Sequence, residues 1–468
     1  MKAVILAAQE ENRCFAGGID HPKPLVMLGG LSLLERAVRS GARAGVSEFL
    51  IVVGARGEPI RRTSEPRLSD LPITWVTADN WPSGSGASIL AAAPFLGREH
   101  FLVMMADHLI LPPTLRHLLE PCLDLSTTLM AIDRKRGPLF DADNTTKVRL
   151  AGRRITELGK SLDPYDGVDI GAAVCSPTFL DALRPEAERQ GGTCSYFDGM
   201  RKLAAAGQLA AYDIGQALWK GVDSPVALKA AETILFDSLR KPTDGFISRH
   251  VERYLSRAVT RVLMRTPVTP NAVTLAVIGI GMTAAFLFAQ PRPGMTILGA
   301  LVFWCASFLD GCDGELARLK FRESRLGGWL DLWADNLVHI MVFVGIGIGL
   351  WRKSGEAQWI LLGIVAALGV VFSVAWVSWA VLRKKRGQGP LFTSVAAGDL
   401  ASRCSWTARL TRFADALSRR DFIFGTIFLA LLGWLPVFLW AAAIGSHIYW
   451  IVLVLIAWQH RQASTAEA

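Results

Sequence analysis

The stretch Asp310–Asp335, DGCDGELARLKFRESRLGGWLDLWAD, follows a long uncharged run and carries four aspartates. Asp310 and Asp313 are three residues apart, and Asp331 and Asp335 are four apart, so each pair shares one face of a helix. A carboxylate at membrane depth costs roughly 2.5–3.5 kcal/mol, so four of them on adjacent spans require a compensating cation. Oxygen ligands favour Mg²⁺, Mn²⁺ or Ca²⁺. Two such ions can clamp a phosphoryl group during its transfer.

Basic residues in the same stretch leave a structural interpretation open. Lys320, Arg322 and Arg325 are near enough along the chain to pair with the aspartates, as interhelical polar pairs or as part of a proton pathway. Three small residues favour a binding site instead, because they let helices or a nucleotide approach closely. They are Gly314, Ala317 and Gly327.

Uncharged runs on both sides of this stretch predict a multi-pass membrane unit, since a spanning helix needs roughly 20 apolar residues. We expect six helices, with Pro436 as a natural break between the last two. They cover Ala272–Ala289, Met295–Leu309, Gly327–Trp351, Trp359–Leu382 and two spans within Phe422–His460.

The net charge of +9 is concentrated in loops between the predicted spans. Basic residues fill Arg318–Arg325 and begin again at Arg383, which places both loops and both termini in the cytoplasm; Arg352 and Lys353 count against this orientation. The first residues, MKAVILAAQ, lack the features of a signal peptide, so we expect the N-terminal part to stay cytoplasmic. Membrane topology accounts for the basic loops, and nucleic acid is therefore not an expected partner.

Residues 1–235 alternate strand-like and helix-like stretches, which predicts an α/β Rossmann-like domain with a parallel sheet and helices on both faces. Ligands of such folds bind beyond the carboxyl ends of the strands. The expected strands are Lys2–Ala7, Phe49–Val53, Ile73–Val76 and Phe101–Met105, and Leu31–Ala44 is an expected helix. Residues 236–268 are expected to form a juxtamembrane segment and residues 269–462 the all-α membrane domain.

The juxtamembrane segment has an arginine at every fourth position from Arg249 to Arg265. On a helix these form a basic stripe beside an apolar stripe, which is typical of a helix in the interface of an anionic membrane. A helix packed on the cytoplasmic domain is the alternative. The apolar positions are Val251, Leu255, Val259, Val262 and Leu263.

The aspartate spacing resembles the signature of the CDP-alcohol phosphatidyltransferase family at every position. It reads Asp310-x-x-Asp313-Gly314-x-x-Ala317-Arg318, eight residues, then Gly327-x-x-x-Asp331-x-x-x-Asp335. Upstream, Thr269-Pro270-Asn271-x-x-Thr274 is similar to that family's entry to its first span. The resemblance implies six transmembrane helices, a CDP-alcohol donor and CMP as the leaving group. It also implies that Asp310, Asp313 and Asp331 hold the metal ions, that Asp335 joins them and takes the proton from the attacking hydroxyl, and that Arg318 lies near the nucleotide phosphates.

The N-terminal part resembles a nucleotidyltransferase. Leu6-Ala7-Ala8, Arg13 and Pro22-Lys23-Pro24-Leu25 look like its entrance, where backbone N–H groups and cations offset a triphosphate. Asp107 follows a hydrophobic strand, and Asp223 lies in Trp219-x-Gly221-Val222-Asp223-Ser224-Pro225, so these two acids are expected to share one Mg²⁺. Ser83–Gly86 is a flexible loop suited to nucleotide contact. An aspartate after a strand is also often a helix cap, and a lysine before proline is often only a surface residue.

One departure from the nucleotidyltransferase pattern concerns the phosphate loop. Gln9 and Glu11 stand where that family has glycines, which permit unusual dihedrals and close phosphate approach. The expected consequences are weak nucleotide binding, a different loop geometry or loss of transferase activity.

Together the two halves resemble the bifunctional inositol-1-phosphate cytidylyltransferase/di-myo-inositol-phosphate-phosphate synthase family. The supporting stretches are Pro22–Leu25, Thr146–Arg149, Asp169–Gly171, Asp244–Arg249 and Leu309–Arg318. The resemblance implies CTP-dependent formation of CDP-inositol, followed by Mg²⁺-dependent transfer to a second inositol 1-phosphate, with Mn²⁺ as an alternative metal. The resemblance of the membrane half to the CDP-alcohol phosphatidyltransferase family implies a homodimer. Lys147 and Lys160 are candidates for substrate contact.

Two other interpretations remain at this point. In one, the chain is a lipid synthase that transfers a CDP-activated head group or a phosphonate analogue to diacylglycerol or another lipid alcohol. In the other, the N-terminal domain binds nucleotide without catalysis, as the Gln9 and Glu11 substitutions suggest.

Overall fold

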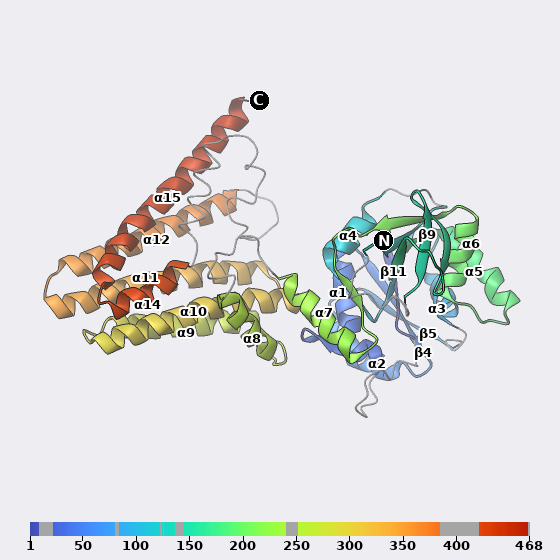
Figure 1. Ribbon diagram of the computed structural model, residues 1–468, viewed down its shortest axis with the longest axis horizontal. Helices are drawn as coiled ribbons and strands as arrows, with labels where there is room; N and C mark the ends of the chain where they lie inside the picture. The colour runs from blue at the N-terminus through green and yellow to red at the C-terminus, as the bar shows by residue number, and fades with distance from the viewer. Residues whose placement is uncertain are drawn as a thin grey trace. The chain divides into compact units, whose positions relative to one another are not determined.

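The computed structural model describes residues 1–8, 22–79, 84–121, 124, 126–135, 145–239, 251–383 and 421–466. The chain divides into two compact units, Met1–Ser238 and Leu239–Ala468, which Figure 1 colours from blue to green and from green to red. Arg13, Gln9, Glu11, Ser83 and the stretch Asp244–Arg249 lie outside the described residues.

Unit 1 is built on a mixed sheet of nine strands in the order β5-β4-β1-β6-β11-β8-β12-β10-β9. The predicted parallel arrangement is right for β5, β4, β1 and β6 and for the β8–β12 pair, but β11 runs antiparallel to β6, β8 and β9. β9 and β10 are joined at Gly152 (φ 66°), a turn too short for the crossover that parallel strands need. The strands are β1 Lys2–Leu6, β2 Met27–Leu28, β3 Leu31–Ser32, β4 Glu48–Gly54, β5 Ile73–Ala78, β6 Phe101–Met105, β7 His108–Ile110, β8 Thr128–Asp133, β9 Lys147–Ala151, β10 Arg154–Gly159, β11 Gly167–Cys175, β12 Leu209–Asp213 and β13 Trp219–Gly221.

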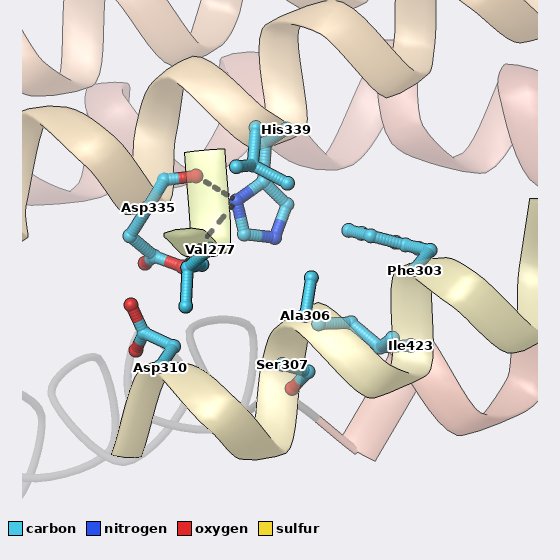
Figure 2. Close-up of a pocket in the computed structure, with 9 residues that line it drawn as sticks. Val277, Phe303, Ala306, Ser307, Asp310, Asp335, His339 and Ile423 are labelled. Carbon is cyan, nitrogen blue, oxygen red and sulfur yellow. Dashed lines mark hydrogen bonds and ion pairs between the residues drawn. The ribbon is translucent and has the colours of Figure 1, made fainter. Parts of the chain in front are cut away.

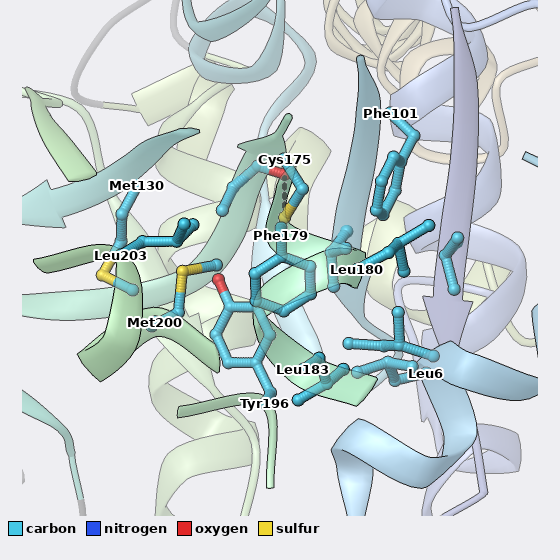
Figure 3. Close-up of a cluster of buried hydrophobic side chains, with 14 of the residues drawn as sticks. Leu6, Phe101, Met130, Cys175, Phe179, Leu180, Leu183, Tyr196, Met200 and Leu203 are labelled. Carbon is cyan, nitrogen blue, oxygen red and sulfur yellow. Dashed lines mark hydrogen bonds between the residues drawn. The ribbon is translucent and has the colours of Figure 1, made fainter. Parts of the chain in front are cut away.

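Helices cover both faces of this sheet, as Figure 1 shows. The helices of unit 1 are α1 Leu33–Ala44, α2 Glu58–Ser64, α3 Ser85–Ala92, α4 Pro112–Leu119, α5 Pro177–Arg189, α6 Tyr196–Ala205 and α7 Pro225–Asp237. Successive strand residues point to opposite faces. Ala3 and Ile5 therefore join the core under α1 and α4, whereas Leu6 joins Phe179 and Tyr196 in the core under α3, α5 and α6 (Figure 3).

Helix α1 begins two residues later than predicted. Ser32 is its N-cap: the hydroxyl of Ser32 accepts from the backbone N–H of Glu35, and the Glu35 carboxylate accepts from the N–H of Ser32. This reciprocal pair satisfies donors that the first helical turn leaves unpaired. Leu31 and Ser32 consequently belong to the short strand β3.

Unit 2 contains five helices that are long and apolar enough to cross a membrane, among the residues that the structure describes. The first of the two spans predicted within Phe422–His460 corresponds to α14, a shorter apolar helix of 11 residues, which ends before Gly433 (φ 71°). Pro436 lies in the first turn of the following helix, where proline is tolerated. The helices are α8 Arg253–Leu263, α9 Pro270–Phe288, α10 Pro293–Leu319, α11 Arg325–Ser354, α12 Gln358–Arg383, α14 Asp421–Leu431 and α15 Leu435–Ala466.

Glycines on α11 allow its neighbours to approach at backbone distance. A Cβ atom added to Gly345 would lie 2.4 Å from the carbonyl oxygen of Ala285, and one added to Gly349 would lie 2.0 Å from that of Phe288. Gly347 makes the same kind of approach to Trp359 at the start of α12. Small residues at such contacts are a common basis of helix packing in membranes, and they fix α11 between α9 and α12.

Candidate functional site

Three of the predicted aspartates converge at the ends of two membrane helices. Asp310 and Asp313 lie near the end of α10, and Asp331 lies in the second turn of α11. One carboxylate oxygen from each lies within 4.8 Å of those of the other two. Asp310 and Asp313 are buried, and Asp331 is half-buried. An all-oxygen set of this kind fits a hard divalent cation such as Mg²⁺.

Asp313 is held in place by a neighbouring helix. The hydroxyl of Thr274 on α9 donates to Asp313 Oδ2 at 2.5 Å, and the backbone N–H of Gly314 donates to Asp313 Oδ1. Thr274 belongs to the Thr269–Thr274 stretch that the sequence related to the entry of the first span. Its contact with Asp313 was not predicted, because pairing between α9 and α10 cannot be read from spacing within either helix.

Asp335 lies one turn beyond Asp331 and lines a small pocket with Asp310 and His339, as Figure 2 shows. His339 Nδ1 donates to the backbone oxygen of Asp335 at 2.7 Å and lies 3.8 Å from its carboxylate Oδ1. Phe303 stands edge-on to the His339 ring at 5.7 Å. Sequence reasoning missed His339, although its position four residues after Asp335 puts it on the same helical face.

The other signature residues lie around this aspartate cluster. Arg318 folds back along α10, so that a Cβ atom on Gly314 would lie 3.3 Å from Arg318 Nη1. A Cβ atom on Gly327 would lie 3.0 Å from Ser324 Oγ, the N-cap of α11. Ala317 is half-buried.

The structural interpretation of the stretch had Lys320 among the basic residues that could pair with the aspartates. In the structure, Lys320 bonds to backbone carbonyl oxygens instead. Its Nζ donates to the carbonyl oxygens of Thr266 at 2.8 Å and Val268 at 3.4 Å. The ammonium therefore stabilises the approach to α9 and leaves the carboxylates to other partners.

In unit 1, Lys23 and Asp107 form the centre of a second polar site. Lys23 Nζ lies 2.5 Å from Asp107 Oδ2, and His108 Nδ1 donates to Asp107 Oδ1 at 2.7 Å. Lys23 comes from a 3₁₀ turn (Lys23–Leu25), and Asp107 directly follows β6. Burial acts to raise the pKa of Asp107, but His108 and Lys23 outweigh it and hold that pKa well below its ordinary value.

A two-stranded ribbon brings the second predicted acid to this site. β7 pairs with β13, which sets His108 opposite Gly221, and the N–H of Val222 donates to the backbone oxygen of Asp107 at 2.9 Å. Asp223 is the next residue along the chain. The His108 ring stacks on Trp219 with ring centres 5.9 Å apart. The pairing brings together the chain segments that carry Asp107 and Asp223, although 115 residues separate the two aspartates in the sequence.

Strand β11 contributes a buried acid beside the same histidine. Burial raises the pKa of Asp169 to about 6, and Asp169 Oδ1 accepts from the N–H of Gly171 at 3.1 Å. Gly171 has a φ of 82°, and a Cβ atom there would lie 2.9 Å from His108 Cδ2. Asp169–Gly171 supported the family resemblance in the sequence, but its closeness to His108 depends on the β6–β11 pairing.

Of the two lysines predicted to contact substrate, Lys147 is the closer to β11. It is the first residue of β9, pairs with Val168 of β11, and its Nζ lies 5.2 Å above the ring of Tyr165. Lys160 is exposed in the turn that follows β10.

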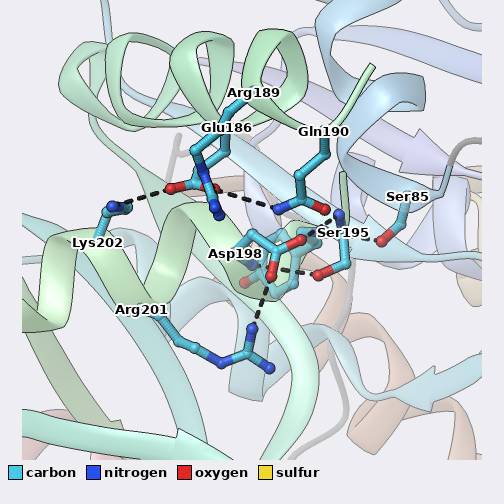
Figure 4. Close-up of polar contacts among 9 residues, drawn as sticks. Ser85, Glu186, Arg189, Gln190, Ser195, Asp198, Arg201 and Lys202 are labelled. Atoms are coloured by element: carbon cyan, nitrogen blue, oxygen red, sulfur yellow. Dashed lines mark hydrogen bonds and ion pairs between the residues drawn. The ribbon is translucent and has the colours of Figure 1, made fainter. Parts of the chain in front are cut away.

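The predicted flexible loop Ser83–Gly86 is wrong at its described residues, because Gly84 is the N-cap of α3 and Ser85 and Gly86 form the first turn of that helix. This turn rests on the start of α6. Gly86 N donates to the Cys194 carbonyl at 3.0 Å, and the Ser85 hydroxyl accepts from Tyr196 N at 2.9 Å. The support behind it is polar (Figure 4): Asp198 binds the N–H of Ser195 and the guanidinium of Arg201. Gly86 has no room for a side chain, because a Cβ atom would lie 2.7 Å from the Cys194 sulfur.

Comparison with known proteins finds two family matches. The MobA-like NTP transferase domain matches residues 3–191, and the CDP-alcohol phosphatidyltransferase family matches residues 267–402. A bifunctional IPC transferase and DIPP synthase from Rubrobacter xylanophilus is 37% identical over 75% of this chain and 79% of the relative. A protein of the same name from Aquifex aeolicus is 28% identical over 79% of this chain and 82% of the relative. The inositol-1-phosphate CTP transferase from T. maritima has a TM-score of 0.45 and 24% identity, covering 50% of this chain and 94% of that one.

Proposed function

The chain belongs to the family of bifunctional IPC transferases and DIPP synthases, and from this premise we propose that it catalyses two successive reactions. In the first, CTP and inositol 1-phosphate give CDP-inositol and pyrophosphate. In the second, the phosphoinositol group of CDP-inositol passes to another inositol 1-phosphate, giving di-myo-inositol phosphate phosphate and CMP. The observation that carries the proposal is the convergence of Asp310, Asp313 and Asp331 in a chain with this family membership.

For the transfer step, we assign Asp310, Asp313, Asp331 and Asp335 to the metal, with Mg²⁺ as the ion and Mn²⁺ as the alternative. When bound, such an ion neutralises phosphate charge and orients the phosphoryl group. Asp335 acts as general base: it accepts the proton of the acceptor hydroxyl as that oxygen attacks phosphorus and CMP departs. Arg318 binds the phosphates of the donor. Half-burial of Asp335, beside the buried Asp310, supports this division of roles.

For the cytidylyl step, we assign Lys23 to catalysis and triphosphate binding, with Arg13 as its partner, and Asp107 and Asp223 to the metal. Lys147 and Lys160 bind the inositol phosphate. The close Lys23–Asp107 pair supports the assignment, because Lys23 is buried, Asp107 is half-buried, and each suits a component of a metal–triphosphate substrate. Lys23 then exchanges Asp107 for phosphate oxygens when CTP binds.

The orientation and assembly belong to the proposal too. Unit 1 and the C-terminus lie in the cytoplasm, as the basic loops favour, the membrane is the cell membrane, and the enzyme is a homodimer in contact with membrane lipid. Protease accessibility in right-side-out and inverted vesicles tests the orientation, and crosslinking in the membrane tests the dimer.

The activity is tested by incubating the full-length enzyme with CTP, Mg²⁺ and a panel of phosphorylated alcohols, followed by mass spectrometry. We expect CDP-inositol first, then the phosphorylated di-inositol product together with CMP. Product formation only with a lipid alcohol as acceptor would replace this proposal with that of a lipid synthase. A second arm without Mg²⁺, then with Mn²⁺, identifies the metal.

A further inference from the structure

Glu315 lies within the aspartate signature, yet neither step uses it. Its side chain is fully buried and accepts three contacts from α8. Arg253 Nη1 donates to Glu315 Oε1 at 3.0 Å, Ser256 Oγ donates to the same oxygen at 3.0 Å, and Thr260 Oγ1 donates to Oε2 at 2.8 Å. Ser256 and Thr260 are also buried, so one face of α8 is sealed against α10 by polar contacts.

The face of α8 that makes these contacts is not one of the two stripes read from the sequence. It carries Glu252, Ser256, Thr260 and Met264, which are spaced by four residues and buried. The predicted apolar stripe is exposed at Val251 and Val262 and half-buried elsewhere. The small hydroxyl residues between the arginines are therefore what fixes α8 to α10, and the exposed apolar positions remain available to the membrane.

Glu315 points away from the metal-binding aspartates. It follows Asp313 by two residues, which places the two side chains about 200° apart around the helix. Asp313 meets Thr274 of α9, whereas Glu315 meets Ser256 and Thr260 of α8. The same turn of α10 is thus held from two sides, once at the metal-binding carboxylate of Asp313 and once at the carboxylate of Glu315, which faces away from the metal-binding aspartates.

We propose that Glu315 is a positioning residue of the transfer reaction, which acts through Arg253, Ser256 and Thr260 to fix the turn of α10 that carries Asp313 and Arg318. The inference rests on the proposed transfer reaction. It makes α8 a part of the membrane active site as well as a juxtamembrane helix. The reason is geometric: a shift of about 1 Å in groups that orient a phosphoryl group costs roughly 10²-fold in rate, and a buried carboxylate with three donors resists such a shift.

The test uses the full-length enzyme in detergent, supplied with CDP-inositol and inositol 1-phosphate, and follows CMP release per folded molecule. Glu315→Gln keeps the size of the side chain but weakens its contacts with Arg253, Ser256 and Thr260. We expect its kcat to fall roughly 10- to 100-fold while KM for CDP-inositol changes less than about threefold. Thr260→Val should lower kcat by about three- to tenfold. The double variant should be about as slow as Glu315→Gln alone, because both changes act on the same Thr260–Glu315 contact.

Matched controls separate positioning from folding. Thr283→Val removes a hydroxyl that bonds only within α9, to the carbonyl oxygen of Gly279, and should leave kcat unchanged. Formation of CDP-inositol by unit 1 should also persist in every variant. A role in stability alone would lower the amount of folded protein and leave kcat per folded molecule intact, which would overturn the inference.

If Glu315→Gln does not fold, Thr260→Val and Ser256→Ala decide: wild-type kcat in both would equally overturn it. If the wild-type enzyme releases no CMP from CDP-inositol, the proposed transfer reaction itself fails. If instead the wild type releases CMP and the Glu315 variants release it equally fast, the transfer reaction stands and only the positioning role of Glu315 is overturned.

Discussion

The two sites of this chain differ in how they are assembled. The membrane site takes its acids from two helices, at spacings of three and four residues that determine which side chains share a face. The site in unit 1 takes Lys23 from a 3₁₀ turn, Asp107 from the residue after β6, Asp169 from within β11 and Asp223 from the segment after β13. The β6–β11 and β7–β13 pairings bring these segments together. Local periodicity is enough to locate the first site, whereas the second depends on the order of strands in a sheet.

The largest effect that tests this comparison is expected for Asp335→Asn. Asparagine is close in size to aspartate but cannot accept the proton, so CMP release should fall by roughly 10²–10⁴-fold. Synthesis of CDP-inositol by unit 1 should continue, and the intermediate should accumulate. Both products are quantified from one reaction; wild-type levels of final product would remove Asp335 from the mechanism, and loss of both would mean that the substitution disrupts the whole protein.

A second effect concerns the pH dependence of the stability of unit 1. Burial raises the pKa of Asp169 from 3.8 to about 6, so folding favours its neutral form. Between pH 4 and pH 6 the unfolded chain ionises and the folded chain does not, so this contribution to stability falls as pH rises and is lost above the folded pKa. Asp169→Asn should therefore gain about 3 kcal/mol relative to wild type between pH 4 and pH 7. Limited proteolysis of the full-length protein across a temperature series measures this change.

Other titratable groups near Asp169 do not change the expected difference in stability between wild type and Asp169→Asn. His108, Tyr196 and Cys175 interact with Asp169 but are present in both proteins. Asp107 has a pKa held below its ordinary value, so its contribution is lost only as pH falls below about 4. Asp213→Asn, at an exposed position of the same sheet, is the matched control. An Asp169→Asn profile parallel to that of wild type would contradict the prediction.

A smaller loss is expected for Gly171→Ala, which should slow CDP-inositol formation by roughly tenfold. The new Cβ atom would displace His108, which holds Asp107, and the positive φ adds strain. Gly152→Ala has a similar φ of 66° but open space around its Cβ position, so it isolates the strain. Equal losses in both variants would mean that contact with His108 is unimportant, and CMP release from supplied CDP-inositol should be normal in both.

The smallest change is expected for Gln9→Gly combined with Glu11→Gly. Removing one negative charge from the predicted phosphate loop, and restoring its backbone freedom, should raise cytidylyl transfer or leave it unchanged. Steady-state rates with CTP measure it, and Glu11→Gln alone separates charge from flexibility. A large loss of activity would instead mean that these side chains take part in a loop of different design.

Much of the membrane unit was predictable because the position of each span, and the residues that share a face of it, follow from the sequence of that helix alone. The spans, the face that Asp310 shares with Asp313, and the face that Asp331 shares with Asp335 follow from hydropathy and from a period of 3.6 residues. Contacts between helices were not predictable: Thr274 with Asp313, or Thr260 with Glu315, require knowledge of which helices pack together. The same holds in unit 1: β1, β4, β5 and β6 were located and correctly predicted to be parallel, whereas β11 and its reversed direction were not predicted. The place of β11 between β6 and β8 depends on pairing between strands that are distant in the sequence.

The two ends of helix α11 have different tasks: the first half carries side chains of the candidate site, and the last third packs against neighbouring helices. Its 30 residues extend about 45 Å; Asp331, Asp335 and His339 occupy the first half, and Gly345, Gly347 and Gly349 occupy the last third. A side chain introduced near the start alters chemistry in a helix that still packs, whereas one introduced near the end collides with backbone atoms of α9 or α12. In a library of random variants, substitutions toward the start of α11 should therefore lower the catalytic rate per folded molecule, and substitutions toward its end should lower the amount of folded protein.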